Sequence, residues 1–538
     1  MPEVRAIPDR DRSSLYISVR GAFPTPRETA LSLAAAILTV LSFPNFNLWF
    51  LAWLGLVPLL LAVVSTGTAL RAFVLGWLYG VVFFYGTCWW LTYPMIHYAH
   101  ISAWAAYPLL LLPVLLVGIF PAIFCGLLSR VTRHYGPSTV YVAPLIWISI
   151  DWLRYVVTGQ LWNALGYSQA FHPMVIQPAR WAGVYAVTCL IVLANASIAY
   201  LLLRRRVILP LLSLLIIIIV IVISSGLFPR RQVVMRHANP ETSVTVIAIQ
   251  PNVPMDLSGD PTQMNELLER HLRLSRNTLA NVENLPGAEY RLVIWPESPM
   301  NFSYSRDRSL QETVGNFARA NRTFILLNSL EPAAGGGDQN SAILINPEGV
   351  IAARYDKIRL MPFGEYVPLP RWLPGASSVR GLVGEFTPGS SYTLMPLGAI
   401  RAGVFICIEA AHPSIARQFT ESGANVLINI SNDGYLGPTA VMRQHLSNAV
   451  FRAVENDRGV IRVTNSGITA NIDPGGSTFE ETRGFQPEVR TWTISRDGDD
   501  ITFYTRYGDI FVYGCALISV GVASASFMRR RSVSEARA

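Results

Sequence analysis

The chain has 538 residues, of which 51% are hydrophobic and only 14% are charged, and its net charge is +8. Soluble domains carry about 25% charged residues, so this composition excludes a purely soluble protein. The net positive charge comes from arginines at the edges of apolar runs, and no basic stripe lies on a globular stretch. We therefore expect no binding of nucleic acid.

The apolar residues are concentrated in two parts of the chain. Residues 1–230 consist largely of apolar runs, 240–500 resembles a soluble domain, and one more apolar run occupies 510–527. A bilayer span takes about 20 mostly apolar residues. The runs predict a multi-span α-helical membrane bundle of about eight helices, at 28–45, 47–65, 72–93, 104–129, 139–156, 180–203, 207–227 and 510–527.

The start of the chain leaves two alternatives open. The first two predicted spans share a Pro44-Asn45-Phe46 break, so they fit either a helical hairpin or one span with a re-entrant piece. The segment 1–27 holds Arg20 and Arg27 but has no small-residue cleavage site. We therefore predict a cytoplasmic N-terminal segment followed by a retained signal-anchor.

The arginines predict the orientation in the membrane, because short cytoplasmic loops are rich in positive charge. With eight spans and a cytoplasmic N-terminus, the loops at 94–103 and 157–179 face outward and are poor in charge. The insert 240–500 then faces outward and the tail 528–538 is cytoplasmic, whereas seven spans would reverse this. The inner segments hold Arg71, Arg130, Arg133, Arg204–Arg206 and Arg529–Arg531.

The insert alternates short β-rich runs with helical patterns. The predicted helices lie at 261–283, 307–321, 412–421 and 439–456, and the predicted strands at 244–250, 292–295, 323–328, 342–346, 402–407, 426–430 and 460–463. Runs such as VTVIAIQ are almost wholly apolar, as expected for strands covered on both faces. An α/β layered domain follows, with ligands expected at the carboxyl ends of its strands.

Two residue types occur only once in the insert. Lys357 is the single lysine among 43 Lys+Arg residues, and Cys407 is the single cysteine outside the predicted spans. Arginine is always charged and presents a rigid fork, whereas lysine is a compact amine. Either an arginine-biased composition left one lysine by chance, or the chain needs amine chemistry at this position.

Three ionisable residues follow apolar strands. Glu297 closes LVIWPES, Lys357 follows the NSAILINPEGVIAARYDK hairpin, and Cys407 closes RAGVFIC. Taken singly, Glu297 also fits a helix cap and Cys407 a core residue. Together they would form a nucleophilic site, in which the carboxylate takes the thiol proton, the thiolate attacks a carbonyl and the ammonium stabilises the oxyanion.

The motifs around these residues resemble a known family. WPES at 295–298, YDKIRLMPFGEYVP at 355–368 and CIEAAHP at 407–413 resemble the Glu, Lys and Cys motifs of the nitrilase superfamily. With the predicted spans, residues 28–525 are similar to the apolipoprotein N-acyltransferase family of the bacterial envelope. Further similar stretches are LWNALGYSQ at 161–169, QNSA at 339–342, SNDGYLGPTAVMRQHL at 431–446 and RGVIRVTNSGITANIDPGG at 458–476.

The resemblance implies a nitrilase-like αββα sandwich and a role for each matching residue. Glu297 is the implied general base, Lys357 the oxyanion-stabilising residue and Cys407 the nucleophile. Glu365 and Glu409 are implied supporting carboxylates, and Asn340 an orienting amide. Neither a cofactor nor a metal is implied.

The implied reaction moves an acyl chain from a phospholipid to the N-terminal S-diacylglyceryl-cysteine of an apolipoprotein, through a thioester. The expected partners are the phospholipid donor, the diacylated lipoprotein acceptor and the bilayer, for a protein acting as a monomer. The resemblance places the protein in the bacterial inner membrane with a periplasmic catalytic domain.

Lipid contacts are expected on the segment 365–390, which we interpret as a mobile flap with Trp372 and Phe386 on its apolar surface, alongside Leu373, Leu382 and Val383. The alternative is a loop packed on its own domain. Two sites depart from the family pattern: Ile408 replaces a frequent aromatic residue, and Gly434-Tyr435 replaces a common tryptophan. Because these positions bear on the acyl-chain pocket, Tyr435 is a further candidate lipid contact.

Other functions remain open at this point. A membrane-anchored amidase would use the same residues with water as the acceptor, and a non-catalytic envelope scaffold would use the domain for binding. A Cys–His pair is the rival mechanism. His412 is predicted at a helix start and His445 as a packing or hydrogen-bonding residue, and no His, Cys and Asp spacing predicts a metal site.

Overall fold

The structure, a computed structural model, describes residues 23–227, 243–257, 260–282, 290–368, 372, 385–495, 498 and 500–535. It falls into two compact units. The helical unit holds the described residues up to Ser168, Val187–Val220 and those from Ile510 onward, and the α/β unit holds Gln169–Ala186 and Ile221–Asp509. Most of the predicted N-terminal segment 1–27 lies outside the described residues.

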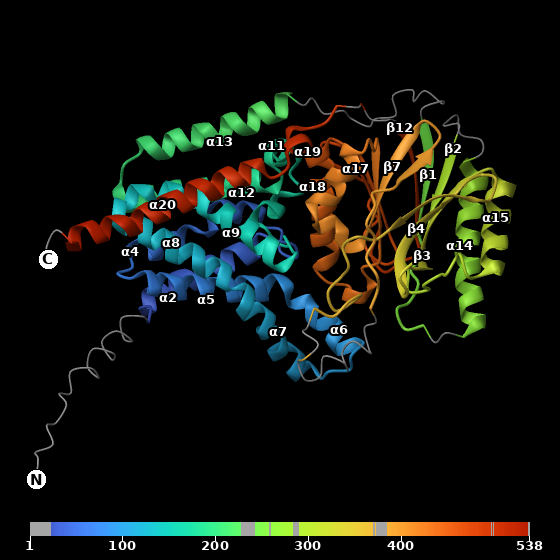
Figure 1. The fold of residues 1–538 in the computed structure, drawn as a ribbon, viewed down its shortest axis with the longest axis horizontal. Helices are drawn as coiled ribbons and strands as arrows, with labels where there is room; N and C mark the ends of the chain where they lie inside the picture. Colours follow the sequence, from blue (N-terminus) through green and yellow to red (C-terminus); the bar gives the residue numbers. More distant parts are fainter. Residues whose placement is uncertain are drawn as a thin grey trace, which may run out of the picture. The chain divides into compact units, whose positions relative to one another are not determined.

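The helical unit confirms a multi-span protein. Six of its helical stretches, over the described residues, are long and apolar enough to cross a membrane: 69–97, 103–135, 137–158, 184–204, 208–226 and 510–528. The α-helices are α2 (Pro26–Leu41), α3 (Ala52–Gly55), α4 (Val57–Ser65), α5 (Ala69–Cys88), α6 (Thr92–His97), α7 (Ala103–Val117), α8 (Ile119–Tyr135), α9 (Ala143–Thr158), α12 (Val184–Arg204), α13 (Ile208–Leu227) and α20 (Ile510–Glu535) (Figure 1).

The first two of the eight predicted spans are shorter than expected. Helix α2 has 16 residues, and Trp49–Ser65 is a shorter apolar stretch. Helix α2 begins with a capping box, in which Thr25 and Glu28 satisfy each other's backbone N–H groups. It ends before Pro44, because the residue before a proline is disfavoured in helical conformation. The predicted break is therefore present.

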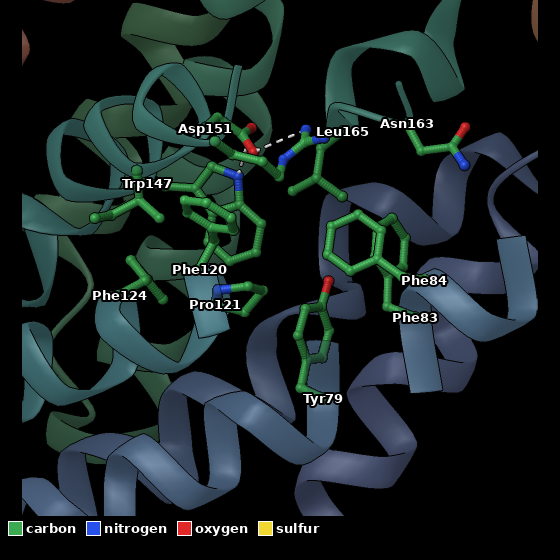
Figure 2. Close-up of a pocket in the computed structure, with 12 residues that line it drawn as sticks. Tyr79, Phe83, Phe84, Phe120, Pro121, Phe124, Trp147, Asp151, Asn163 and Leu165 are labelled. Carbon is green, nitrogen blue, oxygen red and sulfur yellow. Dashed lines mark hydrogen bonds and ion pairs between the residues drawn. The ribbon is translucent and has the colours of Figure 1, made fainter. Parts of the chain in front are cut away.

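The helical unit also buries an ion pair. On α9, Arg154 Nη2 lies 3.2 Å from Asp151 Oδ1, and Trp147 Nε1 donates to Asp151 Oδ2 at 3.1 Å. Figure 2 shows this group beside a cavity of about 20 Å³, walled by aromatic rings that include Tyr79 and Phe83. Such a volume holds about one water molecule. Charges inside a membrane are costly unless they are paired, and here each has its partner.

The α/β unit contains two six-stranded sheets of the same pattern. In each, three neighbouring strands are parallel and the flanking strands are antiparallel: β1, β2 and β3 in the first, and β7, β8 and β9 in the second. The first sheet, in spatial order, is β12 (Glu488–Ser495), β1 (Ser243–Gln250), β2 (Tyr290–Ile294), β3 (Phe324–Pro332), β4 (Asp338–Ile345) and β5 (Ile351–Asp356). The second is β11 (Thr478–Phe479), β10 (Ala470–Ile472), β9 (Val460–Thr464), β8 (Val426–Ser431), β7 (Ile400–Ile406) and β6 (Leu394–Leu397).

Helices cover the outer faces of both sheets, as Figure 1 shows. α14 (Pro261–Val282) and α15 (Arg308–Asn321) share a buried core with the first sheet, and α17 (Pro413–Glu421) and α18 (Val441–Asn456) contact the second. Because strand side chains alternate between faces, Ile247 and Ile249 of β1 meet Leu272 and Leu279 of α14. The predicted αββα sandwich and its four helices are confirmed.

The segment Gln169–Ala186 belongs to the α/β unit, although its last residues fall within the predicted span at 180–203. Arg180 Nη1 lies 2.5 Å from Asp457 Oδ1, and the backbone N–H of Val184 donates to Glu455 Oε1 at 3.0 Å. The predicted span at 180–203 therefore starts four residues later, at Val184. Arg180 is occupied by its contacts within the α/β unit and does not begin the helix.

Candidate active site

The structure brings Glu297, Lys357 and Cys407 together at strand ends. Glu297 follows β2, while Lys357 and Cys407 come directly after β5 and β7. Lys357 Nζ lies 3.6 Å from Glu297 Oε1. Both charges lie close enough to Cys407 to alter the pKa of its thiol. One sheet therefore supplies the acid–amine pair and the other supplies the thiol.

Lys357 is almost completely buried, with 1% of its side chain exposed. Its Nζ donates to Glu365 Oε1 at 2.8 Å, in addition to its contact with Glu297. Burial alone would lower the pKa of Lys357, but the carboxylates of Glu365 and Glu297 hold it well above its ordinary value. The side chain is thus a fixed ammonium group in a space that an arginine fork would overfill.

Asn340 joins the two carboxylates. Its Nδ2 donates to Glu297 Oε1 at 2.9 Å and to Glu365 Oε1 at 2.7 Å. Its own oxygen accepts a hydrogen bond of 2.7 Å from Asn328 Nδ2. Because both amides stand on paired strands, Asn340 on β4 and Asn328 on β3, the sheet sets their direction.

Cys407 is partly exposed and has an unusual backbone, with φ at 52°. Left-handed conformations are disfavoured for residues with a side chain. Burial and the negative charge of Glu297 raise the pKa of the thiol, and the positive charge of Lys357 offsets only part of this. At neutral pH the resting thiol therefore keeps its proton, and its attack requires a base.

Glu409 fixes the backbone around Cys407 and Lys357. It is fully buried, and its Oε2 accepts from the N–H of Ile406 at 2.8 Å. Its Oε1 accepts from the N–H groups of Ile358 and Arg359 at 2.8 and 3.0 Å. One carboxylate thus connects the end of β7 to the loop after β5, which holds the thiol beside the amine.

The predicted lipid contacts are only partly described. Most of the segment 365–390 lies outside the described residues, including Leu373, Leu382 and Val383, so the flap remains a prediction. Trp372 is 80% exposed. The N–H of Phe386 donates to the carbonyl of Glu365 at 3.0 Å, and Tyr435 is half-buried in the turn Gly434–Leu436. The lipid contacts of these three aromatic residues remain predictions.

Residues 385–390, the described end of the predicted flap, contact the loop that holds Lys357. The N–H of Gly389 donates to the carbonyl of Lys357 at 2.8 Å. A side chain at Gly389 would come within 2.1 Å of the Asp356 carbonyl oxygen. Glycine is therefore required for this close approach.

Sequence reasoning missed Asn432, and it predicted His445 only as a packing or hydrogen-bonding residue, without its partner in the site. The N–H of Asn432 donates to Glu297 Oε2 at 3.1 Å, and His445 Nε2 lies 2.9 Å from the carbonyl oxygen of Cys407. Asn432 directly follows β8, so the rule that ligands gather at strand ends could have found it. His412 begins α17 as predicted, and burial and nearby cations lower its pKa to about 3.

Comparison with known proteins decides the family. The model of the apolipoprotein N-acyltransferase N-terminal domain matches residues 35–197, and that of carbon-nitrogen hydrolase matches residues 244–498. The apolipoprotein N-acyltransferase of Geobacter metallireducens is 31% identical over 99% of this chain and 98% of that protein. The chain belongs to the apolipoprotein N-acyltransferase family.

Another N-acyltransferase of this family, from Allorhizobium ampelinum, is 31% identical over 85% of this chain and 88% of its own length. Among solved structures, an amidase from Nesterenkonia sp. is similar with a TM-score of 0.37 and 16% identity. That similarity covers 52% of this chain and 98% of the amidase.

Proposed function

We propose that the protein transfers an acyl chain from a phospholipid to the N-terminal S-diacylglyceryl-cysteine of apolipoproteins, with Cys407 as the nucleophile. Family membership supports the reaction. The observation that carries the residue assignment is a buried ammonium, Lys357, held between Glu297 and Glu365 beside the only thiol of the α/β unit. All these residues come from one chain, so a monomer is sufficient for the reaction.

Of the two carboxylates, Glu297 is the better general base. Glu365 lies 2.8 Å from Lys357 and accepts a hydrogen bond from the N–H of Met361 at 2.7 Å. Its negative charge is therefore already stabilised by these two donors, which makes it a weaker base. Glu297 is farther from Lys357, at 3.6 Å, and its side chain is 15% exposed. The two carboxylates and one ammonium carry a formal charge of −1, which becomes zero when Glu297 takes the thiol proton.

In the first half-reaction Glu297 accepts the Cys407 proton as sulfur attacks the donor ester carbonyl. A carbon–sulfur bond forms, and the Lys357 ammonium stabilises the oxyanion. The carbon–oxygen bond to the lysophospholipid then breaks, and Glu297 returns the proton to the leaving oxygen. The product is a Cys407 thioester.

In the second half-reaction the acceptor amine attacks the thioester carbonyl. Glu297 removes a proton from the amine, the carbon–sulfur bond breaks, and the proton returns to Cys407 sulfur. An amide results, and the enzyme is restored. Thiolate is a good leaving group, which makes a thioester suitable for acylating an amine.

The course of two helices supports a periplasmic α/β unit in the inner membrane. α12 begins in the α/β unit at Val184 and ends at Arg204, with two more arginines following. α20 begins directly after Asp509, the last residue of that unit, and continues into Arg529–Arg531. At 1.5 Å per residue, α12 is about 30 Å long, which matches the hydrocarbon core of a bilayer.

These two arginine clusters are thus separated from the α/β unit by one span each. Since positive clusters mark the cytoplasmic side, the α/β unit faces outward. Arg230, Arg231 and Arg236 do not follow this rule, but they open the long insert, where charge has little effect on translocation. The way in which α2 and Trp49–Ser65 meet the membrane does not change this orientation. The predicted topology, with spans between 28 and 227 and again at 510–527, is proposed on this basis.

Mass spectrometry of a lipoprotein N-terminus, from cells with and without this protein, tests the function. The third acyl chain should disappear without the protein. With purified protein and labelled phospholipid, a peptide bearing diacylglyceryl-cysteine should become labelled. Release of free fatty acid without peptide labelling would instead indicate a hydrolase.

Cysteine variants test the nucleophile. Phospholipid alone should leave a hydroxylamine-sensitive acyl group on Cys407. Cys407→Ala should lose both this group and transfer, and Cys407→Ser should retain little, because a hydroxyl ionises far less than a thiol near neutral pH. Cys189→Ser, in α12, is the matched control and should transfer normally. Transfer by Cys407→Ala would refute the assignment.

A further inference from the structure

A buried charged cluster contacts Cys407 through its backbone carbonyl. His445 on α18 lies with Nε2 2.9 Å from the Cys407 carbonyl oxygen and Nδ1 2.8 Å from Asp433 Oδ1. The side chains of His445 and Asp433 are 3% and 1% exposed. The proposed reaction uses none of the side chains in this cluster. Buried charges cost free energy unless they are paired, so their presence beside Cys407 needs another explanation.

Arg462 on β9 holds Asp433 from the other side. Its Nη2 lies 2.8 and 3.1 Å from the two carboxylate oxygens. Arg462 also donates to Asn429, its direct partner across β8 and β9. Burial alone would raise the pKa of Asp433, but Arg462 and His445 hold it well below its ordinary range. Asp433 is therefore an anion that orients the imidazole ring.

The contacts of His445 define its hydrogens. A carbonyl oxygen faces Nε2 and a carboxylate oxygen faces Nδ1, and both can only accept. Arg462 Nη2 also lies 3.2 Å from Nδ1, but Asp433 Oδ1 can accept from each of these nitrogens. The carbonyl oxygen of Cys407 can only accept, so Nε2 carries a hydrogen and donates to it. Because Nε2 is engaged at this carbonyl, it does not present a lone pair to the thiol proton in this arrangement.

The cluster contacts a residue, Cys407, whose backbone conformation is unfavourable. Cys407 has φ at 52°, and such a conformation persists only when its surroundings hold it. Glu409 holds the N–H of Ile406, the residue before the thiol. His445 holds the carbonyl of Cys407 itself. The turn that aims the thiol is therefore held on both sides.

We propose that His445, oriented by Asp433 and Arg462, is a positioning residue whose Nε2–H group holds the Cys407 carbonyl and so directs the thiol at the acyl donor. This inference rests on the proposed function of Cys407 as the nucleophile. The recognised group is a backbone carbonyl, and the required property of residue 445 is an N–H donor at the position of Nε2.

Two amide variants separate this role from simple packing. The Gln side chain can place an N–H donor near the position of histidine Nε2, whereas Asn can reach only the position of Nδ1. His445→Asn thus keeps a group near Asp433 and loses the bond to Cys407. We expect His445→Asn to lower kcat for acylation of Cys407 by labelled phospholipid by about 10- to 100-fold at similar KM. His445→Gln should recover most of the loss.

Ser447→Ala is the matched control, since Ser447 is a buried polar residue of the same helix whose hydroxyl donates to the Arg443 carbonyl at 2.9 Å. It should acylate normally. Thermal melting of each variant reports folding, and rates are compared among folded variants. Equal rates for His445→Asn and His445→Gln, or a wild-type rate for His445→Asn, would overturn the inference.

A failure of the proposed function gives a different result. In that case wild-type protein would not be acylated on Cys407, whatever residue stands at 445. If His445→Asn does not fold, Asp433→Asn provides the second variant, because it weakens the orientation of His445. The lost negative charge would by itself lower the pKa of the Cys407 thiol, not raise it. The variant should lower kcat by about tenfold, and an unchanged kcat would again overturn the inference.

Discussion

Replacing Asn340 by leucine should lower kcat by about 10- to 100-fold while the protein stays folded. Asn340 donates to Glu297 at 2.9 Å and to Glu365 at 2.7 Å. A hydrogen bond to a charged group contributes about 1.5–3 kcal/mol. Without Asn340, Glu365 still accepts hydrogen bonds from Lys357 and from the N–H of Met361. The loss of rate therefore comes from the missing hydrogen bond between Asn340 and Glu297. The loss of this bond accounts for the expected range.

Asn340→Asp should be worse than Asn340→Leu near neutral pH. It places a third carboxylate about 2.9 Å from Glu297, and two unit charges at this distance repel by about 6 kcal/mol at an effective dielectric constant of 20. Like charges raise each other's pKa. As the pH falls, a proton shared by the carboxylates should restore a donor, so the activity of this variant relative to Asn340→Leu should rise.

The assay is transfer from labelled phospholipid to a diacylglyceryl-cysteine peptide in detergent, analysed for kcat and KM. Asn328→Ala is the matched control, because the Asn328 amide donates to Asn340 and to the Ser341 carbonyl, and not to Glu297 or Glu365. It should lose less than about tenfold. Activity of Asn340→Leu within threefold of wild type, or an equal loss in Asn328→Ala, would refute this reasoning.

Three further predictions concern other parts of the chain. Lys357→Arg and Lys357→Met should each lose about 100-fold or more of kcat in the same assay, because the guanidinium fork does not fit where the lysine side chain is only 1% exposed and methionine has no charge. Near-normal activity of Lys357→Arg would contradict the requirement for a lysine. Arg154→Met should destabilise the protein by about 3–5 kcal/mol in thermal unfolding, since it leaves Asp151 uncompensated. Adding Asp151→Leu should recover most of that stability, and no recovery would argue against the pair. Burial lowers the pKa of His271 from 6.5 to about 4, so stability should fall as the pH decreases between these values, by about 3 kcal/mol in total. His271→Phe should flatten this dependence, and an unchanged dependence of Tm on pH would contradict it.

The secondary structure was predictable where burial is continuous. Strands such as β1 and β8 are buried along their whole length, so their apolar runs stand out in the sequence. β12 was missed because EVRTWTIS is polar and only half-buried at the edge of its sheet. Its pairing with β1, for example Trp492 with Val246, depends on the fold. The first two spans were overestimated for a similar reason, since hydropathy does not show where α2 ends.

The amino-acid sequence by itself determined the division into apolar and soluble parts, the layered α/β class and the three reactive residue types. These properties are carried by local composition, periodicity and motifs, which hydrophobic burial and chemistry impose on short stretches. Only the tertiary structure decided which groups form hydrogen bonds or ion pairs with each other. Asn340 bridges Glu297 and Glu365, and His445 reaches the Cys407 carbonyl, because strand order and register bring distant segments together. Hydrogen-bond partners of this kind are set by geometry at about 3 Å, which no local pattern encodes.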